Sequence, residues 1–329
     1  MMENSEKRPM VILTGPTAVG KTALSIELAK KINGAIISAD SMQVYKYMDI
    51  GSAKIRPEEM DGVRHYMIDE FEPEEEFHVV KFVEKAKEYL EQIYSEGKIP
   101  IIVGGTGFYI QALLYDIDFT EQECDEKYRK ELEQLAEEKG AEYLHEMLRQ
   151  VDPASAEAIH ANNRKRVIRA LEFYHLSGKR ISEHNETERK KESPYQFAYF
   201  VLTDDRAHLY ERIDRRVDLM IEQGLVEEVK KLKSMGYHKE MVSMQGLGYK
   251  EILAYLDGEM TLEEAVYIVK RETRHFAKRQ LTWFRREKDV IWLNKPDFDY
   301  NEEKILSYLL ERWNEIVSAD AQGKGEETC

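Results

Sequence analysis

A glycine-rich octapeptide near the N-terminus constrains the fold of this chain more than any other feature: Gly15-Pro16-Thr17-Ala18-Val19-Gly20-Lys21-Thr22. It follows an apolar run, Met10–Leu13, and precedes a segment with helical character, Ala23–Ile32. This order of strand, glycine loop, Lys-Thr and helix is the context in which the G-x-x-x-x-G-K-[ST] pattern binds phosphate. The glycines let backbone N–H groups form a nest for phosphate oxygens, and the helix directs the positive end of its dipole to the same place.

The pattern predicts an α/β fold: a P-loop-type parallel sheet flanked by helices, with a site for a di- or triphosphate. Lys21 adds a full positive charge to that site, and the Thr22 hydroxyl can ligate a Mg²⁺ that also contacts the phosphates. The loop by itself does not decide whether the ligand is a nucleotide such as ATP.

Composition narrows the class of protein. The chain has 329 residues, of which 42% are apolar, enough for one large domain or two smaller ones. We expect no membrane segment, because no apolar run is long enough to span a bilayer. Cys124 and Cys329 allow neither a zinc site nor a disulfide framework, so a reduced cytoplasmic protein is the simplest interpretation. The net charge of −15 argues against a polyanionic partner unless basic residues cluster locally.

Two further strands end in polar residues. The run Ala35–Ser38 leads to Asp40, and the run Lys98–Val103 leads to a second glycine loop, Gly104–Gly107, which contains Thr106. In open parallel sheets the carboxyl ends of the strands face the ligand crevice, so we expect Asp40 and Thr106 beside the phosphate loop. From position alone, a turn or N-cap aspartate explains Asp40 equally well.

The sequence changes character in the middle of the chain. Strand-like runs are replaced by charged helical patterns between residues 119 and 193. We therefore expect an all-helical insertion domain there, within an α/β core formed by residues 1–118 and 194–316. Residues 317–329 are polar and include Gly, and we expect a disordered tail.

Basic residues do cluster locally. The segment Arg164-Lys165-Arg166-Val167-Ile168-Arg169 is one such cluster, although alone it also fits a solvated helix face. Between Ile268 and Lys288 there are eight Lys or Arg and only two Glu, a local charge of +6 on a long helical pattern. A basic stripe of this kind suits a nucleic-acid backbone.

A third group of cations follows the strand-like run Phe197–Leu202. Arg212 and Arg216 lie four residues apart, so they share a helix face. Arginines beside a phosphate loop often hold transferred or leaving phosphates. Pairing with the nearby acidic residues Glu211, Asp214 and Asp218 is an equally good interpretation.

Taken together, the motifs resemble the tRNA dimethylallyltransferase (isopentenyltransferase, or IPP transferase) family. The order of the motifs is more specific than any one of them, and departures are small, such as Ser52 where Thr is expected. The matching segments are residues 15–22, Ser38-Ala39-Asp40-Ser41-Met42-Gln43-Val44-Tyr45, Met48-Asp49-Ile50-Gly51-Ser52-Ala53-Lys54, Gly104-Gly105-Thr106-Gly107-Phe108-Tyr109, residues 166–178, residues 212–218, Gln245-Gly246-Leu247-Gly248-Tyr249-Lys250-Glu251 and Ala277-Lys278-Arg279-Gln280-Leu281-Thr282-Trp283-Phe284-Arg285.

The resemblance implies transfer of a dimethylallyl group from dimethylallyl diphosphate to the N6 amine of the adenosine 3′-adjacent to the anticodon in tRNA. Residues Gly15 to Thr22 would hold the diphosphate, with Mg²⁺ at Thr22. Asp40 would act as general base, Thr106 would place the adenine, and Arg216 would neutralise the leaving group. The resemblance and the basic segments together imply tRNA contacts at Asp40, Ser41, Met42, Gln43, Thr106, Arg164, Lys165, Arg166, Arg169, Gln245, Gly246, Lys250, Arg274, Lys278 and Arg279.

Three alternatives remain open at this point. A P-loop small-molecule kinase would use the same loop for ATP, but it would not need the insertion or the basic helix. An adenylate isopentenyltransferase would use a free nucleotide rather than the anticodon stem-loop. A GTPase would account for Asn294-Lys295-Pro296-Asp297, although no Asp-x-x-Gly follows a strand in the right region. We expect a monomer.

Overall fold

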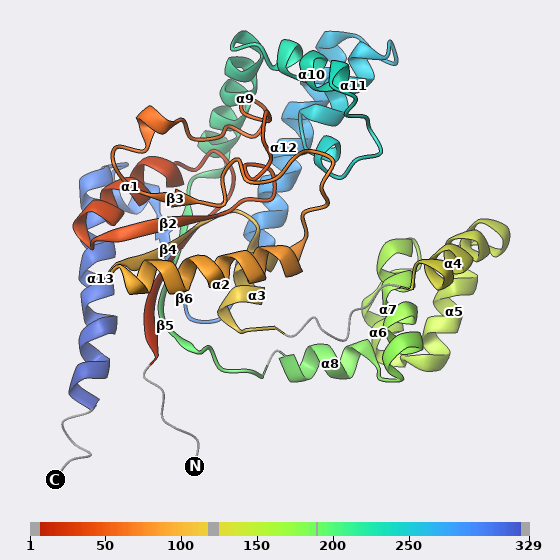
Figure 1. The fold of residues 1–329 in the computed structure, drawn as a ribbon, viewed down its shortest axis with the longest axis horizontal. Coiled ribbons are helices and arrows are strands. Elements are labelled where there is room, and N and C mark those ends of the chain that lie inside the picture. Colours follow the sequence, from red (N-terminus) through yellow and green to blue (C-terminus); the bar gives the residue numbers. More distant parts are fainter. Residues whose placement is uncertain (1–6, 118–124, 189, 324–329) are drawn as a thin grey trace. The chain divides into compact units, whose positions relative to one another are not determined.

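The computed structural model describes residues 7–117, 125–188 and 190–323, and it divides the chain into two compact units (Figure 1). One unit comprises Met1–Leu113 and Pro194–Cys329, and the other comprises Leu114–Ser193. Both cysteines lie outside the described residues. Within those residues, no helix combines the length and the apolar character needed to cross a membrane.

The first unit is built on a sheet of six strands in the order β3-β2-β4-β1-β5-β6, and every neighbouring pair is parallel. The predicted parallel α/β sheet is therefore confirmed. Thr14, the last residue of β1, lies opposite Gly104 of β4, and Gly104 also lies opposite Ala39 of β2. This register brings three loops out side by side at one edge of the sheet. The strands are β1 (Arg8–Thr14), β2 (Gly34–Ala39), β3 (His65–Tyr66), β4 (Ile99–Gly104), β5 (Tyr195–Thr203) and β6 (Val290–Asn294).

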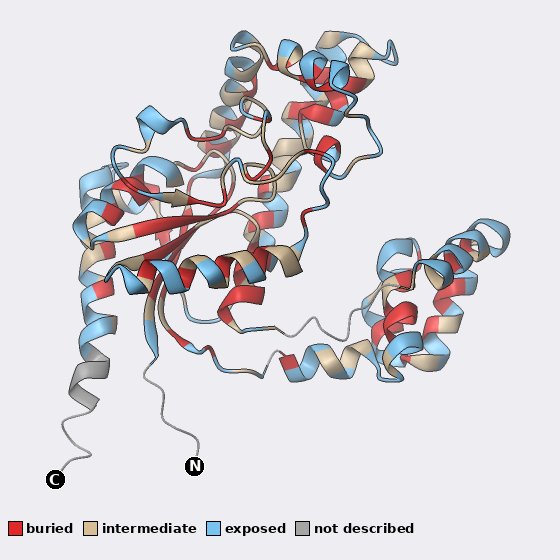
Figure 2. Cartoon of the chain, viewed as in Figure 1, coloured by how far each residue is buried: buried red, intermediate tan, exposed pale blue. Residues whose placement is uncertain are grey.

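Helices cover both faces of the sheet, which explains why the strands are continuous apolar runs rather than alternating ones. Val11 and Leu13 of β1 belong to a core cluster with α1 (Lys21–Lys31) and α13 (Glu302–Gly323). Ile12, between them, points to the other face and is also fully buried. α2 (Val79–Ser95) packs against β2 and β4 through apolar residues at helical spacing. Figure 2 shows the strands buried and the outward faces of the helices exposed.

The remaining helices of this unit carry residues that line the site or support it. They are α3 (Gly107–Leu114), α9 (Arg206–Glu222), α10 (Leu225–Ser234), α11 (Tyr249–Leu256) and α12 (Leu262–Phe284), with short 3₁₀ turns η1 (Pro57–Glu59), η2 (Ser243–Gln245) and η3 (Lys295–Phe298). α12 begins with a capping box, because Thr261 accepts from the Glu264 N–H and Glu264 accepts from the Thr261 N–H. It packs against α9 and α11.

One boundary expectation is wrong. The disordered tail predicted from residue 317 does not begin there, because α13 continues to Gly323. Extending a helix that is already formed needs no new nucleation, so a polar composition alone does not end it. Residues 324–329 of that predicted tail lie outside the described residues.

The second unit is all-helical and has its own core. Leu144, Leu148, Val167 and Leu171 are buried in one cluster. Asp152 caps α6, where it accepts from the N–H and the hydroxyl of Ser155, and also binds Ser182 through the same two kinds of donor. Its helices are α4 (Glu126–Lys139), α5 (Ala141–Val151), α6 (Pro153–Ala158), α7 (Arg164–Ser177) and α8 (Ile181–Glu188).

A prediction follows from the close approach of β4 and β2. A Cβ atom at Gly104 would overlap the backbone carbonyl of Ala39, which cannot move without breaking the sheet register. We expect Gly104→Ala to lower the free energy of unfolding by about 2 kcal/mol, the usual scale of overpacking. Urea unfolding measures this, with the exposed helix residue Glu84 changed to Ala as the control, expected to shift by less than about 0.5 kcal/mol. Equal midpoints for the two variants would contradict the overlap.

Candidate active site

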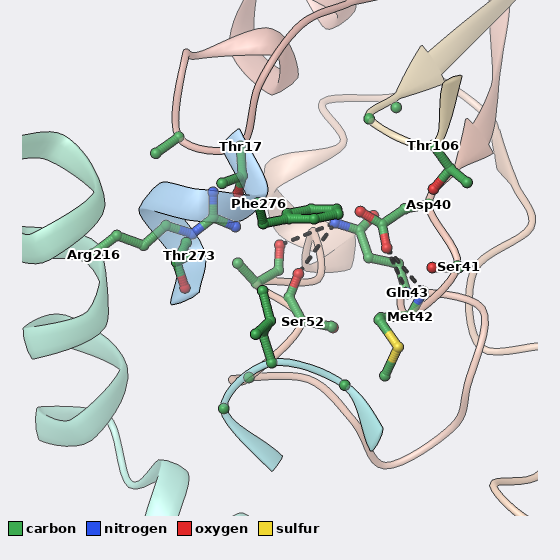
Figure 3. A pocket seen from close by; sticks show the side chains of 18 of the residues that line it. Thr17, Asp40, Ser41, Met42, Gln43, Ser52, Thr106, Arg216, Thr273 and Phe276 are labelled. Atoms are coloured by element: carbon green, nitrogen blue, oxygen red, sulfur yellow. Dashed lines mark hydrogen bonds between the residues drawn. The ribbon is translucent and has the colours of Figure 1, made fainter. Parts of the chain in front are cut away.

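A cavity of about 900 Å³ lies where the carboxyl ends of β1, β2 and β4 meet (Figure 3). Its lining includes the phosphate loop, the segment after β2, the second glycine loop and residues of α9, α12 and the loop before α11. The phosphate loop, Asp40 and Thr106 therefore face one space, as expected from the strands that they follow. Lining residues with functional side chains include Thr17, Lys21, Thr22, Asp40, Ser41, Met42, Gln43, Thr106, Arg212, Arg216, Gln245, Lys250, Phe276, Arg279 and Gln280.

Cations hold the carbonyl groups of the phosphate loop. Lys21 Nζ donates to the carbonyl oxygens of Gly15 and Pro16, each at 2.9 Å, and Arg212 Nε donates to that of Ala18 at 2.8 Å. Ala18 and Gly20 have positive φ angles of 63° and 102°, which turn successive peptide groups in alternate directions. A loop of this shape can aim N–H groups inward at an anion.

The positive groups of the cavity affect one another. Burial lowers the pKa of Lys21 from 10.5 to about 8, with the charge of Arg216 as the next cause, while Asp40 acts in the opposite direction. Burial also lowers the pKa of Arg216, and Asp40 opposes that shift too. Positive charge is thus concentrated beside one carboxylate, in a place where an anion would relieve the repulsion.

α9 separates its charges by face. Arg212 and Arg216 line the cavity, whereas Asp214 pairs with Arg274 and Asp218 pairs with Lys270, both on α12. Of the acidic residues that offered an alternative partner for Arg212 and Arg216, Asp214 and Asp218 are therefore engaged with α12 instead. Arg206 is exposed, its guanidinium 5.2 Å from the ring centre of Tyr210, and it does not line the cavity.

Asp40 is both a turn residue and a cavity residue. Its Oδ1 accepts from the backbone N–H groups of Met42 at 2.9 Å and Gln43 at 3.4 Å. Within the described part of the chain these are its hydrogen bonds, so Oδ2 is the oxygen placed to accept a proton. Figure 3 shows Asp40, Thr106 and Arg216 directed into the same cavity.

Gln280 joins the two glycine loops. Its Oε1 accepts from the N–H of Thr17 at 2.9 Å, and its Nε2 donates to the carbonyl of Gly105 at 2.9 Å. A Cβ at Gly105 would overlap the Gln280 amide, and one at Gly107 would overlap the Trp283 ring. The second glycine loop therefore needs glycine because α12 packs directly on its backbone.

Not every predicted contact residue lines the cavity. Within the phosphate loop, Gly15, Pro16 and Val19 are buried and do not line the cavity. A Cβ at Gly15 would overlap the carbonyl of Leu202. Arg274 is engaged with Asp214, and Lys278 is exposed outside the lining. In the second unit Arg164, Lys165 and Arg166 are exposed in the first turn of α7, while Arg169 is half-buried against Glu172.

Gln280, Phe276 and Thr273 are among the cavity residues to which the sequence assigned no role. Gln280 has a recognisable signal, since it is a polar residue on the same helix face as buried Ala277 and Phe284. Phe276 and Thr273 also line the cavity. Phe276 carries the Arg279 guanidinium 5.8 Å from its ring centre.

Known proteins are similar to this chain over most of its length. A family model described as IPP transferase matches residues 43–287. The chain is 66% identical over 303 residues to the tRNA dimethylallyltransferase of Lachnoclostridium phytofermentans, covering 92% of this chain and 96% of the relative. It is 56% identical over 300 residues to that of Acetivibrio thermocellus, with 91% and 96% covered.

Solved structures give the same result. The chain resembles the tRNA isopentenylpyrophosphate transferase of Bacillus halodurans with a TM-score of 0.72 and 44% identity, covering 96% of this chain and 100% of that one. It also resembles a eukaryotic dimethylallyltransferase acting on tRNA, with a TM-score of 0.76 and 32% identity, covering 87% of this chain and 74% of that one.

The lowered pKa of Lys21 predicts a pH dependence of anion binding. Above pH 8 the free protein loses the Lys21 charge, so its affinity for inorganic pyrophosphate should fall as pH rises. Lys21→Arg keeps its charge throughout this range. The wild-type affinity divided by that of the variant, normalised at pH 7, should fall up to about tenfold by pH 9, because a group with this pKa is then about one-tenth protonated.

Calorimetric titration at fixed Mg²⁺ measures both affinities, and the ratio cancels the titration of pyrophosphate itself. A ratio that stays flat from pH 7 to pH 9 would show that Lys21 remains charged in the free protein.

Proposed function

Because this chain belongs to the IPP transferase family, it is a prenyl transferase that modifies tRNA, and we propose that its cavity transfers a dimethylallyl group from dimethylallyl diphosphate to the N6 amine of the adenosine 3′-adjacent to the anticodon. One observation carries the proposal. The phosphate loop with its cations and the Asp40–Gln43 segment face a single cavity large enough for both reactants.

The phosphate loop binds the diphosphate. Lys21 exchanges its bonds to the carbonyls of Gly15 and Pro16 for phosphate oxygens, and Arg216 lies ready to neutralise the leaving group. Diphosphate departs only when its growing negative charge is offset, so these fixed cations lower the barrier directly. Arg212 supports the same loop from behind through the carbonyl of Ala18.

A Mg²⁺ ion fits this site through Thr22. The described residues contain no group of three or more His, Cys, Asp or Glu side chains placed to hold a metal. Mg²⁺ at phosphate sites is bound largely by substrate oxygens and water, so one hydroxyl at the loop is a sufficient protein anchor. Thr22 lines the cavity at the start of α1. When bound, the ion offsets charge on the diphosphate.

Asp40 acts as the base. The N6 atom forms a bond to the allylic carbon while the bond from that carbon to the diphosphate oxygen breaks, and the proton released from N6 passes to Asp40 Oδ2. An aromatic amine is a weak nucleophile, so a carboxylate within reach is needed. Thr106 and Gln43 lie on either side of Asp40 in the cavity lining, and they would orient the adenine.

The acceptor is part of an RNA. A stacked base has to be splayed out of its loop to enter an enclosed cavity. Arg164, Lys165 and Arg166 lie in the first turn of α7, and that turn contains no acidic residue. Cations are unfavourable at the positive end of a helix, so the cluster favours a bound polyanion. We propose that the second unit contacts the anticodon stem-loop.

We propose that the protein acts as a monomer. We further propose that it acts in the cytoplasm, where its tRNA substrate is modified.

The transfer itself is the first test. Purified protein with Mg²⁺ and labelled dimethylallyl diphosphate should label an anticodon stem-loop RNA. Asp40→Asn should lower kcat at least about 100-fold, the usual contribution of a general base. Asp61→Asn, an exposed carboxylate paired with Lys30, should leave kcat unchanged.

Two results would contradict this function. Label entering AMP but not RNA would indicate an adenylate isopentenyltransferase, and ATP turnover with no prenyl transfer would indicate a kinase.

Arg216 gives a second prediction. Arg216→Gln should lower kcat about 100-fold, because an oriented charge on the leaving group is lost. It should also weaken product inhibition by inorganic pyrophosphate. Arg206→Gln, on the same helix but outside the cavity, is the matched control and should behave as wild type. If Arg216→Gln changes only the KM for RNA, Arg216 does not contact the leaving group.

A further inference from the structure

The loop between Asp49 and Lys54 forms one wall of the cavity and is held from outside by a single carboxylate. Glu228 on α10 accepts from three successive backbone N–H groups: those of Asp49 at 3.0 Å, Ile50 at 2.7 Å and Gly51 at 3.1 Å. Glu228 itself does not line the cavity. Three amides on one carboxylate fix the path of a loop that otherwise has no regular structure.

Tyr249 completes this contact. Its hydroxyl donates to Glu228 Oε1 at 2.8 Å, and its fully buried ring packs on Gly51, where a Cβ would come within 2.6 Å of the ring. Burial raises the pKa of the Tyr249 hydroxyl, and the Glu228 charge adds to the shift, so the hydroxyl remains a donor. Tyr249 belongs to the Gln245–Glu251 motif, and several other residues of this motif line the cavity.

Lys54 holds the other end of the loop. Its buried Nζ donates to the carbonyl of Tyr45 at 2.7 Å and pairs with Asp49 at 2.6 Å and Asp69 at 2.5 Å. With both ends fixed, the carbonyl groups in the middle of the loop have defined directions.

Those carbonyls orient Gln43. Its Nε2 lies 3.4 Å from the carbonyl oxygen of Ser52 and 3.3 Å from that of Ala53, and its Oε1 accepts from Ser38 Oγ at 3.4 Å (Figure 3). The backbone N–H of Gln43 donates to Asp40. Glu228 therefore holds the backbone at the start of the loop, and the backbone carbonyls further along the same loop hold the Gln43 amide beside the proposed base.

We propose that Glu228 is a positioning residue for the acceptor adenosine: it fixes the Asp49–Lys54 loop, and the loop orients Gln43 next to Asp40. The inference rests on the proposed function and goes beyond it by assigning the acceptor side of the cavity a support of its own. The phosphate loop is held by other groups, namely Lys21, Arg212 and Gln280. Loss of Glu228 should therefore affect the acceptor and spare the donor.

Glu228→Gln keeps the shape of the side chain but removes its charge and one of its acceptor oxygens. Since hydrogen bonds to charged groups are the strong ones, we expect the KM for the stem-loop RNA to rise about tenfold, with the KM for dimethylallyl diphosphate within twofold of wild type. Tyr249→Phe, which keeps the ring on Gly51, should show the same split with a smaller rise, about threefold. The matched control is Glu227→Gln, an exposed neighbour paired with Lys230, which should leave both values unchanged.

A double-mutant cycle tests whether Glu228 acts through Gln43. If it does, Glu228→Gln combined with Gln43→Ala should lower kcat/KM for RNA no further than Gln43→Ala alone. Additive losses, an equal rise in both KM values, or an unchanged KM for RNA would each overturn the inference. Wild-type protein that transfers nothing would overturn the proposed function, and this inference with it, whereas normal transfer with a wild-type KM in Glu228→Gln would overturn the inference alone.

Discussion

The arrangement of the site depends on the two hydrogen bonds of the Gln280 side-chain amide. It is nearly fully buried, and it bonds in one direction to Thr17 of the phosphate loop and in the other to Gly105 of the second glycine loop. Both loops emerge from neighbouring parallel strands, so the sheet sets their separation and Gln280 sets their mutual orientation. A buried amide with one donor and one acceptor satisfied by backbone resists displacement, because breaking either bond leaves an unpaired buried group.

In this chain of net charge −15, the charged side chains of α9 are separated by helix face. α9 gives two carboxylates, Asp214 and Asp218, to cations of α12, and turns Arg212 and Arg216 to the cavity. Part of the basic stripe expected on α12 is therefore paired with carboxylates of α9. Lys21, Arg212 and Arg216 lie beside the phosphate loop, where an anionic ligand gains most from their charge because the surroundings are partly buried.

Local patterns predicted the parts of the site that a short stretch of chain builds. The phosphate loop, Asp40 and Thr106 each follow a strand, and the rule that parallel strands end at one edge predicts that they lie close together. Lys295 illustrates the limit. Its motif suggested a guanine site, yet its buried Nζ lies 3.5 Å from the carbonyl of Val19 in the phosphate loop, and Asp297 accepts from the Asn294 amide. In this protein the residues of the motif contribute to packing.

The sequence by itself determined the strands of the sheet, the phosphate loop and the carboxylate beside it. Each of these is formed by about ten consecutive residues or fewer and is governed by backbone geometry. Only the tertiary structure decided which arginines of α9 face the cavity, that Gln280 joins two loops 175 and 263 residues away, and that Glu228 holds a loop 177 residues earlier in the chain. Contacts at such separations depend on how helices pack after the sheet has formed, and no local periodicity records that choice.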